Sequence, residues 1–446
     1  MNAIWQDVKT LMTLAWPVVI SRVGILTLGI TDTVVVGHYA SEHLAYLGIG
    51  MVPSNIFILI MIGLLMGTSV LVSNKFGAKQ YSETGKVWWH ALPWGLVIGL
   101  VGMVFCFFGE PLLLLSGQTP ELAAAGGRIS MIAGLSLPFA AVHMSTGFFL
   151  EGIRNPRPGM VIMIVANIVN IFANYIFVFG AFGFPELGAE GSIWATLVVR
   201  FMQVVAILSY VWVFLDHEKF GLRKPKITWA GGREMRSIGY ATGISMGIEN
   251  TAFNVVILFA GFLGTVVVAA HIIMINVFAL FFMMGLGFGV ATAVSVGNAY
   301  GAGDMAAVKR WAWLGLCVQS LIMAFAGVFM WVSAPQLATF FTTDAEVIKL
   351  AAALIALVSI GTVFDTGQSL LSMSLRARGD TWVPTFIHVL SYGVIMIPLT
   401  YALIFPLGRG ALGLADGIVL GAFVPFALVI WRYRWLDKQA QSVSAS

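Results

Sequence analysis

Apolar segments of about 20 residues or more recur along the chain, and each is long enough to cross a lipid bilayer as a helix. Twelve such segments lie at roughly residues 11–36, 51–73, 88–108, 128–149, 159–180, 191–214, 238–261, 267–296, 312–333, 350–375, 384–405 and 411–431. Only 10% of the 446 residues are charged, whereas soluble proteins typically carry about 25%. We therefore predict an all-α membrane protein with twelve transmembrane helices. The net charge of only +4 gives no reason to expect a nucleic-acid partner.

The Lys and Arg residues outside the apolar segments are unevenly distributed, and this asymmetry predicts the orientation in the membrane. Of the 24 Lys and Arg residues in the chain, Arg22 and Arg200 fall within spans and 19 fall on one side, six of them in the longest loop at residues 215–236. The opposite side carries Arg128, Lys349 and Arg409. Because cytoplasmic loops are enriched in Lys and Arg, we expect both termini to be cytoplasmic. We expect the protein to lie in a bacterial inner (plasma) membrane.

The loop at residues 215–236 divides the chain into two halves of six spans, and one constant shift aligns the halves. The shift that brings Ser21 onto Ser245 also brings Gly77 onto Gly301. We predict an N-terminal lobe at residues 1–214, a cytoplasmic linker at 215–236 and a C-terminal lobe at 237–446. Six is an even number, so the two bundles share one orientation and a pseudo-two-fold axis along the membrane normal. Parallel repeats of this kind are typical of transporters that work by alternating access.

Paired motifs in the two halves resemble those of the multidrug and toxic compound extrusion (MATE) transporters. The first span has Ala15-Trp16-Pro17 with Thr31-Asp32-Thr33, which resembles the first-helix signature of the family. The paired motifs are Phe76-Gly77-Ala78 and Tyr300-Gly301-Ala302 in the loops after the second and eighth spans, and Leu150-Glu151-Gly152 and Leu375-Arg376-Ala377-Arg378-Gly379-Asp380 in the loops after the fourth and tenth spans. The chain is most similar to the NorM branch, which has a glutamate in the seventh span and an aspartate in the tenth, matching Glu249 and Asp365. The DinF branch typically has an aspartate in the fifth span, where this chain has Asn174.

The resemblance implies a function. A member of this family exports organic cationic drugs and toxic compounds by antiport against H⁺ or Na⁺, through alternating access. We expect no enzymatic activity, since H-x-x-x-H and Walker motifs are absent, no cofactor beyond the coupling ion, and a monomer in the lipid bilayer. The alternative is a flippase for lipid-linked oligosaccharides, which has a related fold. Drug-resistance phenotype and lipid-sugar accumulation distinguish the two.

Two acids of the C-terminal half, Glu249 and Asp365, stand about 10 residues into their spans, roughly 15 Å from the cytoplasmic end. Acidic side chains inside a bilayer usually face a cavity or a partner, so we expect the two carboxylates to share one cavity. Neighbouring buried carboxylates retain a proton more readily than isolated ones. Their oxygens can instead hold Na⁺, a hard cation that prefers oxygen ligands. Purely structural hydrogen bonding is the alternative.

Asp32, Asn174 and Thr196 lie in different spans of the N-terminal half at similar depth, roughly 8 Å from the outer end. Asn170 precedes Asn174 by one helical turn and shares its face. We expect this group to hold the Asp32 charge or a cation. Asn and Thr also join membrane helices by hydrogen bonds, so a packing role is the alternative.

Arg22 is a charged residue within the first span, one turn from the position equivalent to Glu249. We expect it to contact an acid of the opposite half in one access state, with Glu249 favoured. A structural role is the alternative.

Overall fold

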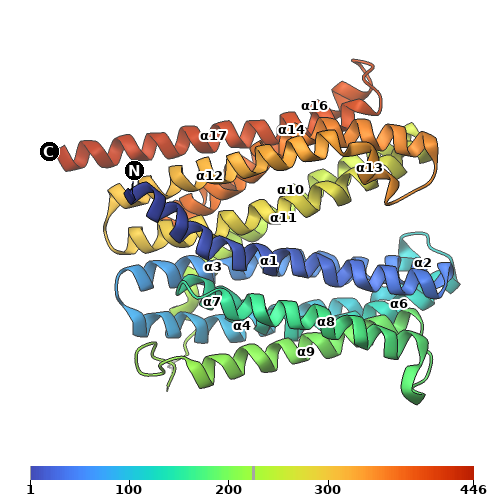
Figure 1. Cartoon of the computed structure of the whole chain (residues 1–446), viewed down its shortest axis with the longest axis horizontal. Helices are drawn as coiled ribbons and strands as arrows, with labels where there is room; N and C mark the ends of the chain where they lie inside the picture. Colours follow the sequence, from blue (N-terminus) through green and yellow to red (C-terminus); the bar gives the residue numbers. More distant parts are fainter. Residues whose placement is uncertain (1, 224–226, 446) are drawn as a thin grey trace. The chain divides into compact units, whose positions relative to one another are not determined.

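The structure is a computed structural model that describes residues 2–223 and 227–445, so Lys224, Lys226 and Ser446 lie outside the described residues. The first half of the chain forms α1 (Asn2–Tyr39), α2 (Ser41–Gly50), α3 (Val52–Gly77), α4 (Tyr81–Phe107), α5 (Gly109–Leu115), α6 (Pro120–Leu135), α7 (Leu137–Gly152), α8 (Arg157–Phe179), η1 (Ala181–Gly183) and α9 (Ala189–Phe214) (Figure 1). The second half forms η2 (Ala230–Gly232), α10 (Arg233–Leu263), α11 (Thr265–Gly301), α12 (Met305–Val332), α13 (Ala334–Thr339), α14 (Ala345–Ala377), α15 (Val383–His388), η3 (Val389–Met396), α16 (Ile397–Ile404) and α17 (Leu412–Ala445).

The described chain has the predicted twelve helical spans that are long and apolar enough to cross a membrane. They are Ile4–Tyr39, Glu42–Gly77, Tyr81–Phe107, Pro120–Gly152, Arg157–Phe179, Ala189–Phe214, Ala230–Leu263, Thr265–Gly301, Met305–Val332, Ala345–Ala377, Val383–Ile404 and Leu412–Gln439. Most helices extend beyond the apolar segments, because polar residues continue the backbone hydrogen bonding of a helix past the apolar stretch.

The predicted duplication is visible in the positions where helices begin and end. α3 ends at Gly77 and α11 ends at Gly301, the two glycines that the sequence shift aligns. α4 begins at Tyr81 and α12 begins at Met305, and the same shift aligns these two residues. The helix boundaries therefore repeat at the offset that aligns the sequences.

The two halves differ where prolines interrupt the first copy. α3 and α7 begin as new helices with a proline in their first turn, Pro53 and Pro138. Proline has no N–H to donate to the preceding turn. The corresponding spans of the second copy, α11 and α14, are single uninterrupted helices. The second copy has its own irregularity in the eleventh span, where η3 is an eight-residue π-helix.

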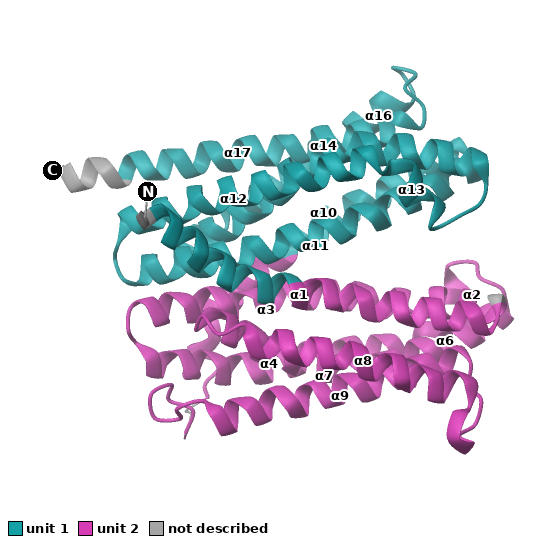
Figure 2. Cartoon of the chain, viewed as in Figure 1, with its two compact units in different colours: residues 1–19, 244–446 teal, residues 20–243 magenta. Residues whose placement is uncertain are grey.

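The chain folds into two compact units, coloured separately in Figure 2. Unit 1 consists of residues 1–19 and 244–446, and unit 2 of residues 20–243. These units do not follow the predicted lobe boundaries, because the divisions fall inside α1 and α10. The segment at residues 215–236 accordingly belongs to unit 2.

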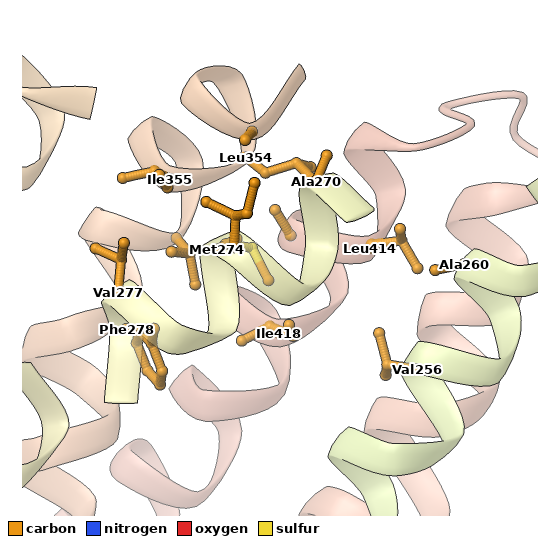
Figure 3. Close-up of a cluster of buried hydrophobic side chains, with 14 of the residues drawn as sticks. Val256, Ala260, Ala270, Met274, Val277, Phe278, Leu354, Ile355, Leu414 and Ile418 are labelled. Carbon is orange, nitrogen blue, oxygen red and sulfur yellow. The ribbon is translucent and has the colours of Figure 1, made fainter. Parts of the chain in front are cut away.

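Each unit has its own apolar core. In unit 1, side chains of α10, α11, α14 and α17 pack together, among them Val256, Met274, Leu354 and Ile418 (Figure 3). In unit 2, one cluster gathers α3, α4, α7 and α9, and a second joins α1, α2, α6, α8 and α9. Helices that carry the predicted site residues are thus held by apolar packing within their own unit.

Two glycines let α10 lie directly on α3 inside unit 2. A Cβ atom on Gly67 would collide with the carbonyl oxygen of Met235, and one on Gly239 would collide with that of Leu64. Small residues allow membrane helices to approach this closely. The first part of α10 is therefore fixed to α3 by backbone contact.

Candidate functional site

The Asp32 carboxylate is the centre of a buried polar cluster in unit 2. Oδ1 accepts hydrogen bonds from the amide groups of Asn174 at 2.8 Å and Asn170 at 3.2 Å. Oδ2 accepts one from the Thr196 hydroxyl at 2.7 Å. The structure thus brings together Asp32, Asn174 and Thr196, which the sequence placed at one depth, with Asn170, which precedes Asn174 by one turn.

Further oxygens in the Asp32 cluster have no donor. The side-chain oxygens of Asn170 and Asn174 are buried, and neither has a hydrogen-bond partner among the described residues. Buried polar atoms in proteins usually have a partner. The cluster therefore contains buried oxygen atoms that are still able to accept, the type of ligand that hard cations prefer.

The Asp365 carboxylate lies in the interior of unit 1, where only 1% of the residue is exposed. Its Oδ1 accepts hydrogen bonds from the Tyr392 hydroxyl at 2.9 Å and from the Gln368 amide at 3.3 Å. The same Gln368 amide lies 3.1 Å from the Tyr392 oxygen. Asp365 is therefore held by a tyrosine and a glutamine that sequence reasoning did not identify.

Tyr392 also connects Asp365 to Glu249. Its hydroxyl is close enough to the Glu249 side chain to interact with it, and the two carboxyl groups interact electrostatically with each other. Tyr392 belongs to η3, the π-helix of the eleventh span. π-Helical turns are rare and frequently occur at functional sites. The structure thus places Glu249, Asp365 and Tyr392 in one interacting group.

Arg376 occupies the last turn of α14, although the sequence placed it in a loop. Its guanidinium is buried and donates to the Ser245 hydroxyl at 2.7 Å. It also interacts electrostatically with Glu249. The acid pair therefore has a buried positive charge nearby.

Arg22 has a partner that the sequence did not predict. Its Nη2 donates to Glu151 at 2.9 and 3.1 Å, and both side chains are 9% exposed. The guanidinium also lies over the Phe148 ring, 5.2 Å from its centroid. Glu151 was read as part of a loop motif, but it lies within α7 and belongs to unit 2, as Arg22 does. The coupling of Arg22 to Glu249 stays a prediction.

We expect the Arg22–Glu151 pair to act as one structural unit. Arg22→Met or Glu151→Gln alone leaves an uncompensated buried charge, a change that costs about 3–5 kcal/mol. The double variant has no such charge, so its melting temperature in detergent should exceed that of either single variant. Strictly additive losses across the cycle would instead show that the two charges do not depend on each other.

The sequence indicates the three unpredicted residues, Gln368, Glu151 and Tyr392, to different degrees. Gln368 follows Asp365 by three residues and shares its helix face, so spacing alone could have indicated it. Glu151 stood at the end of an apolar segment, where an acid is easily assigned to the following loop. Tyr392 left no readable signal, because its direction depends on the local π-helix.

A duplicated helical protein with twelve candidate membrane spans, and with buried carboxylates inside those spans in both units, has the architecture of a secondary transporter. The sequence model of the MatE family matches the chain twice, at residues 17–176 and 241–402. The chain belongs to the MatE family. The starts of the two matches are separated by the same offset as the repeat.

Relatives with known names support a NorM-like member of this family. The chain is 35% identical to the "Probable multidrug resistance protein NorM" of Caulobacter vibrioides, over 99% of this chain and 95% of the relative. It is 29% identical to the "Multidrug resistance protein NorM" of Burkholderia vietnamiensis, over 94% and 92% of the two chains. These names are those of transporters, and the flippase alternative finds no support in them.

Solved structures share the fold at low sequence identity. The crystal structure of the eukaryotic MATE transporter AtDTX14 matches with a TM-score of 0.89 and 18% identity, covering 98% of both chains. An outward-facing multidrug resistance MATE family transporter of the MOP superfamily matches with a TM-score of 0.90 and 19% identity, covering 98% of this chain and 97% of the other. The chain therefore has the MATE fold and is a multi-pass membrane protein.

Proposed function

We propose that this protein is a secondary active multidrug exporter, which moves organic cations out of the cell in exchange for H⁺ or Na⁺. The main support is the pairing of Glu249 with Asp365 through Tyr392 inside the spans of a MatE-family chain. The NorM relatives are named as multidrug resistance proteins, which agrees with multidrug export. The acids supply the negative charge that an organic cation requires in a poorly hydrated site.

The number of hydrogens shared by Tyr392, Asp365 and Glu249 explains how the acid pair would exchange one bound cation for another. The Tyr392 hydroxyl has one hydrogen, which it donates to Asp365 at 2.9 Å. Its oxygen can then accept a hydrogen bond from Glu249 only when Glu249 carries a proton. When Glu249 loses that proton, two carboxylates compete for a single donor, and an additional cation is needed to balance them.

The same competition makes the exchange obligatory. A proton or Na⁺ at the pair cancels charge that would otherwise attract the drug. At a separation of ~6 Å and an effective dielectric of about 20, one unit charge contributes about 3 kcal/mol, or roughly 100-fold in affinity. The drug and the coupling ion therefore bind alternately.

Asp32 would act in unit 2 and assist the conformational change. Its carboxylate can bind H⁺, or Na⁺ with the two free amide oxygens as further oxygen ligands, without contributing to the Glu249–Asp365 pair. The two coupling sites would thus lie in different units.

Ethidium efflux from proteoliposomes, with the Na⁺ and H⁺ gradients imposed separately, tests the proposal. We expect efflux to follow one of the two gradients and to stop when that gradient is collapsed. Efflux that responds to neither gradient, or ion conductance without ethidium transport, would reject the antiport function.

Removing the Tyr392 hydroxyl should alter the ion dependence of transport more than it alters folding. Tyr392→Phe keeps the ring but takes away the group between the acids, so export should slow and its pH profile should change. Tyr401→Phe is a matched control, because Tyr401 is an exposed residue of α16 in the same span. Identical pH profiles for the wild type and Tyr392→Phe would contradict the shared-proton arrangement.

We further propose that the protein lies in a bacterial inner membrane as a monomer, with both termini in the cytoplasm. This orientation follows from the excess of Lys and Arg on one side of the spans. Reporter fusions at the C-terminus and within residues 215–236 should read as cytoplasmic, and a fusion within residues 181–190 as periplasmic. The reverse pattern would exclude this topology.

A further inference from the structure

Arg376 is a buried cation of unit 1 that forms no ion pair with any described acid. Only 3% of the residue is exposed. Its Nη2 donates to the Ser245 hydroxyl at 2.7 Å and lies 3.5 Å from the Thr385 oxygen, and its Nε has no hydrogen-bond partner in the described chain. Charged residues inside a bilayer usually pair with one another. The direct contacts of Arg376 therefore leave its charge without a balancing carboxylate.

The first half of the chain shows how the same position is neutralised. The paired motifs align Glu151 with Arg376, and each residue is the last but one of its helix, α7 or α14. Glu151 forms an ion pair with Arg22, the residue after Ser21. Ser21 aligns with Ser245, and in the second half it is this hydroxyl that accepts from Arg376. Both halves thus join the same two helices at this point, but only the first half does so with opposite charges.

Ser245 connects Arg376 to the acid pair. It precedes Glu249 by four residues in α10, so the two side chains lie one turn apart on one face of the helix. The guanidinium that is bonded to Ser245 interacts electrostatically with Glu249. Arg376 is therefore held one helical turn from the residue that we propose to bind the coupling ion.

The other titratable groups near Arg376 do not neutralise it. Asp380 interacts with it electrostatically, but this carboxylate forms its own ion pair with Arg432 at 2.7 Å. His388 also lies near Arg376, has no negative charge to offer, and its Nε2 lies 3.2 Å from the Ser372 hydroxyl. Of the two acids that interact with Arg376, Glu249 is therefore the one without an ion pair to another described residue.

We propose that Arg376 is the internal counter-ion of the Glu249–Asp365 pair and sets how tightly the pair holds the coupling ion and the drug. The inference rests on the proposed antiport function. Arg376 acts through Glu249 and is thus a positioning residue. Its charge balances part of the negative charge of the empty pair and opposes every cation that binds there. At a separation of ~10 Å and an effective dielectric of about 20, one such charge lowers cation affinity roughly tenfold.

Arg376→Gln tests the proposal in the full-length purified protein, with ethidium as the probe. Glutamine can still donate to Ser245 but has no charge. Without H⁺ or Na⁺ in competition, the variant should bind ethidium about tenfold more tightly than the wild type. The ion concentration that doubles the apparent dissociation constant of ethidium should fall about tenfold, because the ion is also held more tightly.

Transport by Arg376→Gln provides a second measurement in proteoliposomes. Both the half-saturating ethidium concentration and the maximal efflux rate should fall, because cations that bind more tightly leave more slowly. A defect in folding lowers the maximal rate without improving the affinity. The combination of tighter binding and slower efflux therefore separates the counter-ion role from a structural one.

Three further variants control for the position and the charge. Arg376→Lys keeps the charge and should retain wild-type values. Lys349→Gln removes a positive charge from an exposed position near the other end of α14, and it should also leave binding unchanged. Ser245→Asp gives Arg376 a carboxylate partner, as Glu151 is for Arg22, so it should reproduce the tighter binding. If Arg376→Gln fails to fold, Ser245→Asp decides.

The possible failures are distinguishable. If the wild type responds to H⁺ or Na⁺ but Arg376→Gln and Ser245→Asp have unchanged constants, the counter-ion role is overturned and the antiport function stands. Equal changes in Lys349→Gln, or loss of wild-type behaviour in Arg376→Lys, would also overturn it, since the effect would not follow the charge at this position. Wild-type ethidium binding that responds to neither ion would reject the antiport function and the role of Arg376 with it.

Discussion

Glu249→Gln and Asp365→Asn should each give a folded, membrane-inserted protein that no longer exports ethidium against its gradient. Both substitutions keep the side-chain shape and remove the charge that the drug and the coupling ion share. Gradient-driven efflux should fall to the background of empty vesicles. The affinity for ethidium should lose most of its dependence on pH or Na⁺, because the roughly 100-fold electrostatic effect of one charge is absent.

The control for this pair is Glu346→Gln. Glu346 lies on α14 with Asp365, but it is exposed in the first turn of the helix. Glu346→Gln removes one negative charge, as the two acid variants do, but at a position outside the acid pair. Export by this variant should therefore continue at the wild-type rate. If both acid variants exported ethidium as fast as the wild type under the normal gradient, the assignment of Glu249 and Asp365 would be wrong.

Asp32→Asn should strongly impair transport while leaving the ion dependence of drug affinity intact. The Asp32 carboxylate accepts hydrogen bonds on both oxygens, from two amides and from the Thr196 hydroxyl. An asparagine has no charge, so the hydrogen bonds that remain in the cluster are no longer made to a charged acceptor. A hydrogen bond to a charged group contributes about 1.5–3 kcal/mol, enough to shift a conformational equilibrium more than tenfold.

Thr33→Val provides the comparison for Asp32→Asn. Thr33 is the next residue of α1, is exposed, and donates to the carbonyl of Gly29 in its own helix. Its removal should leave transport unchanged. Two measurements on Asp32→Asn are needed, the efflux rate and the binding of ethidium at two pH values. Loss of the pH or Na⁺ dependence of binding in Asp32→Asn would show that Asp32 belongs to the drug-binding pair.

The sequence predicted the features that depend on length and periodicity. Span number follows from the thickness of the bilayer, and the repeat follows from a constant offset between matching residues. The depth of a residue in the membrane follows from its position along a straight helix, and this predicts that Asp32, Asn174 and Thr196 lie together. The rotation of each helix about its axis was not readable, so the partners of Asp365 and Arg22 were missed.

Local breaks in helices account for the remaining differences. Tyr392 reaches Asp365 from a π-helix, and no apolar periodicity indicates such a turn. Glu151 and Arg376 were assigned to loops because charged residues usually end an apolar segment. In the structure each lies inside its helix, where Glu151 pairs with Arg22 and Arg376 donates to Ser245. A charged residue at the end of an apolar segment can therefore lie inside the helix and have a buried polar or charged partner.

The division into units has a mechanical consequence, because the chain crosses between them only inside helices. The crossings fall at residues 19–20 of α1 and 243–244 of α10. The two units are connected by helices and not by flexible linkers. Any change in the arrangement of the units therefore requires these two helices to bend or twist. Glu249 stands shortly beyond the second crossing, on the helix whose beginning is fixed to α3 by Gly67 and Gly239. Glu249 therefore stands on one of the two helices through which the chain passes from one unit to the other.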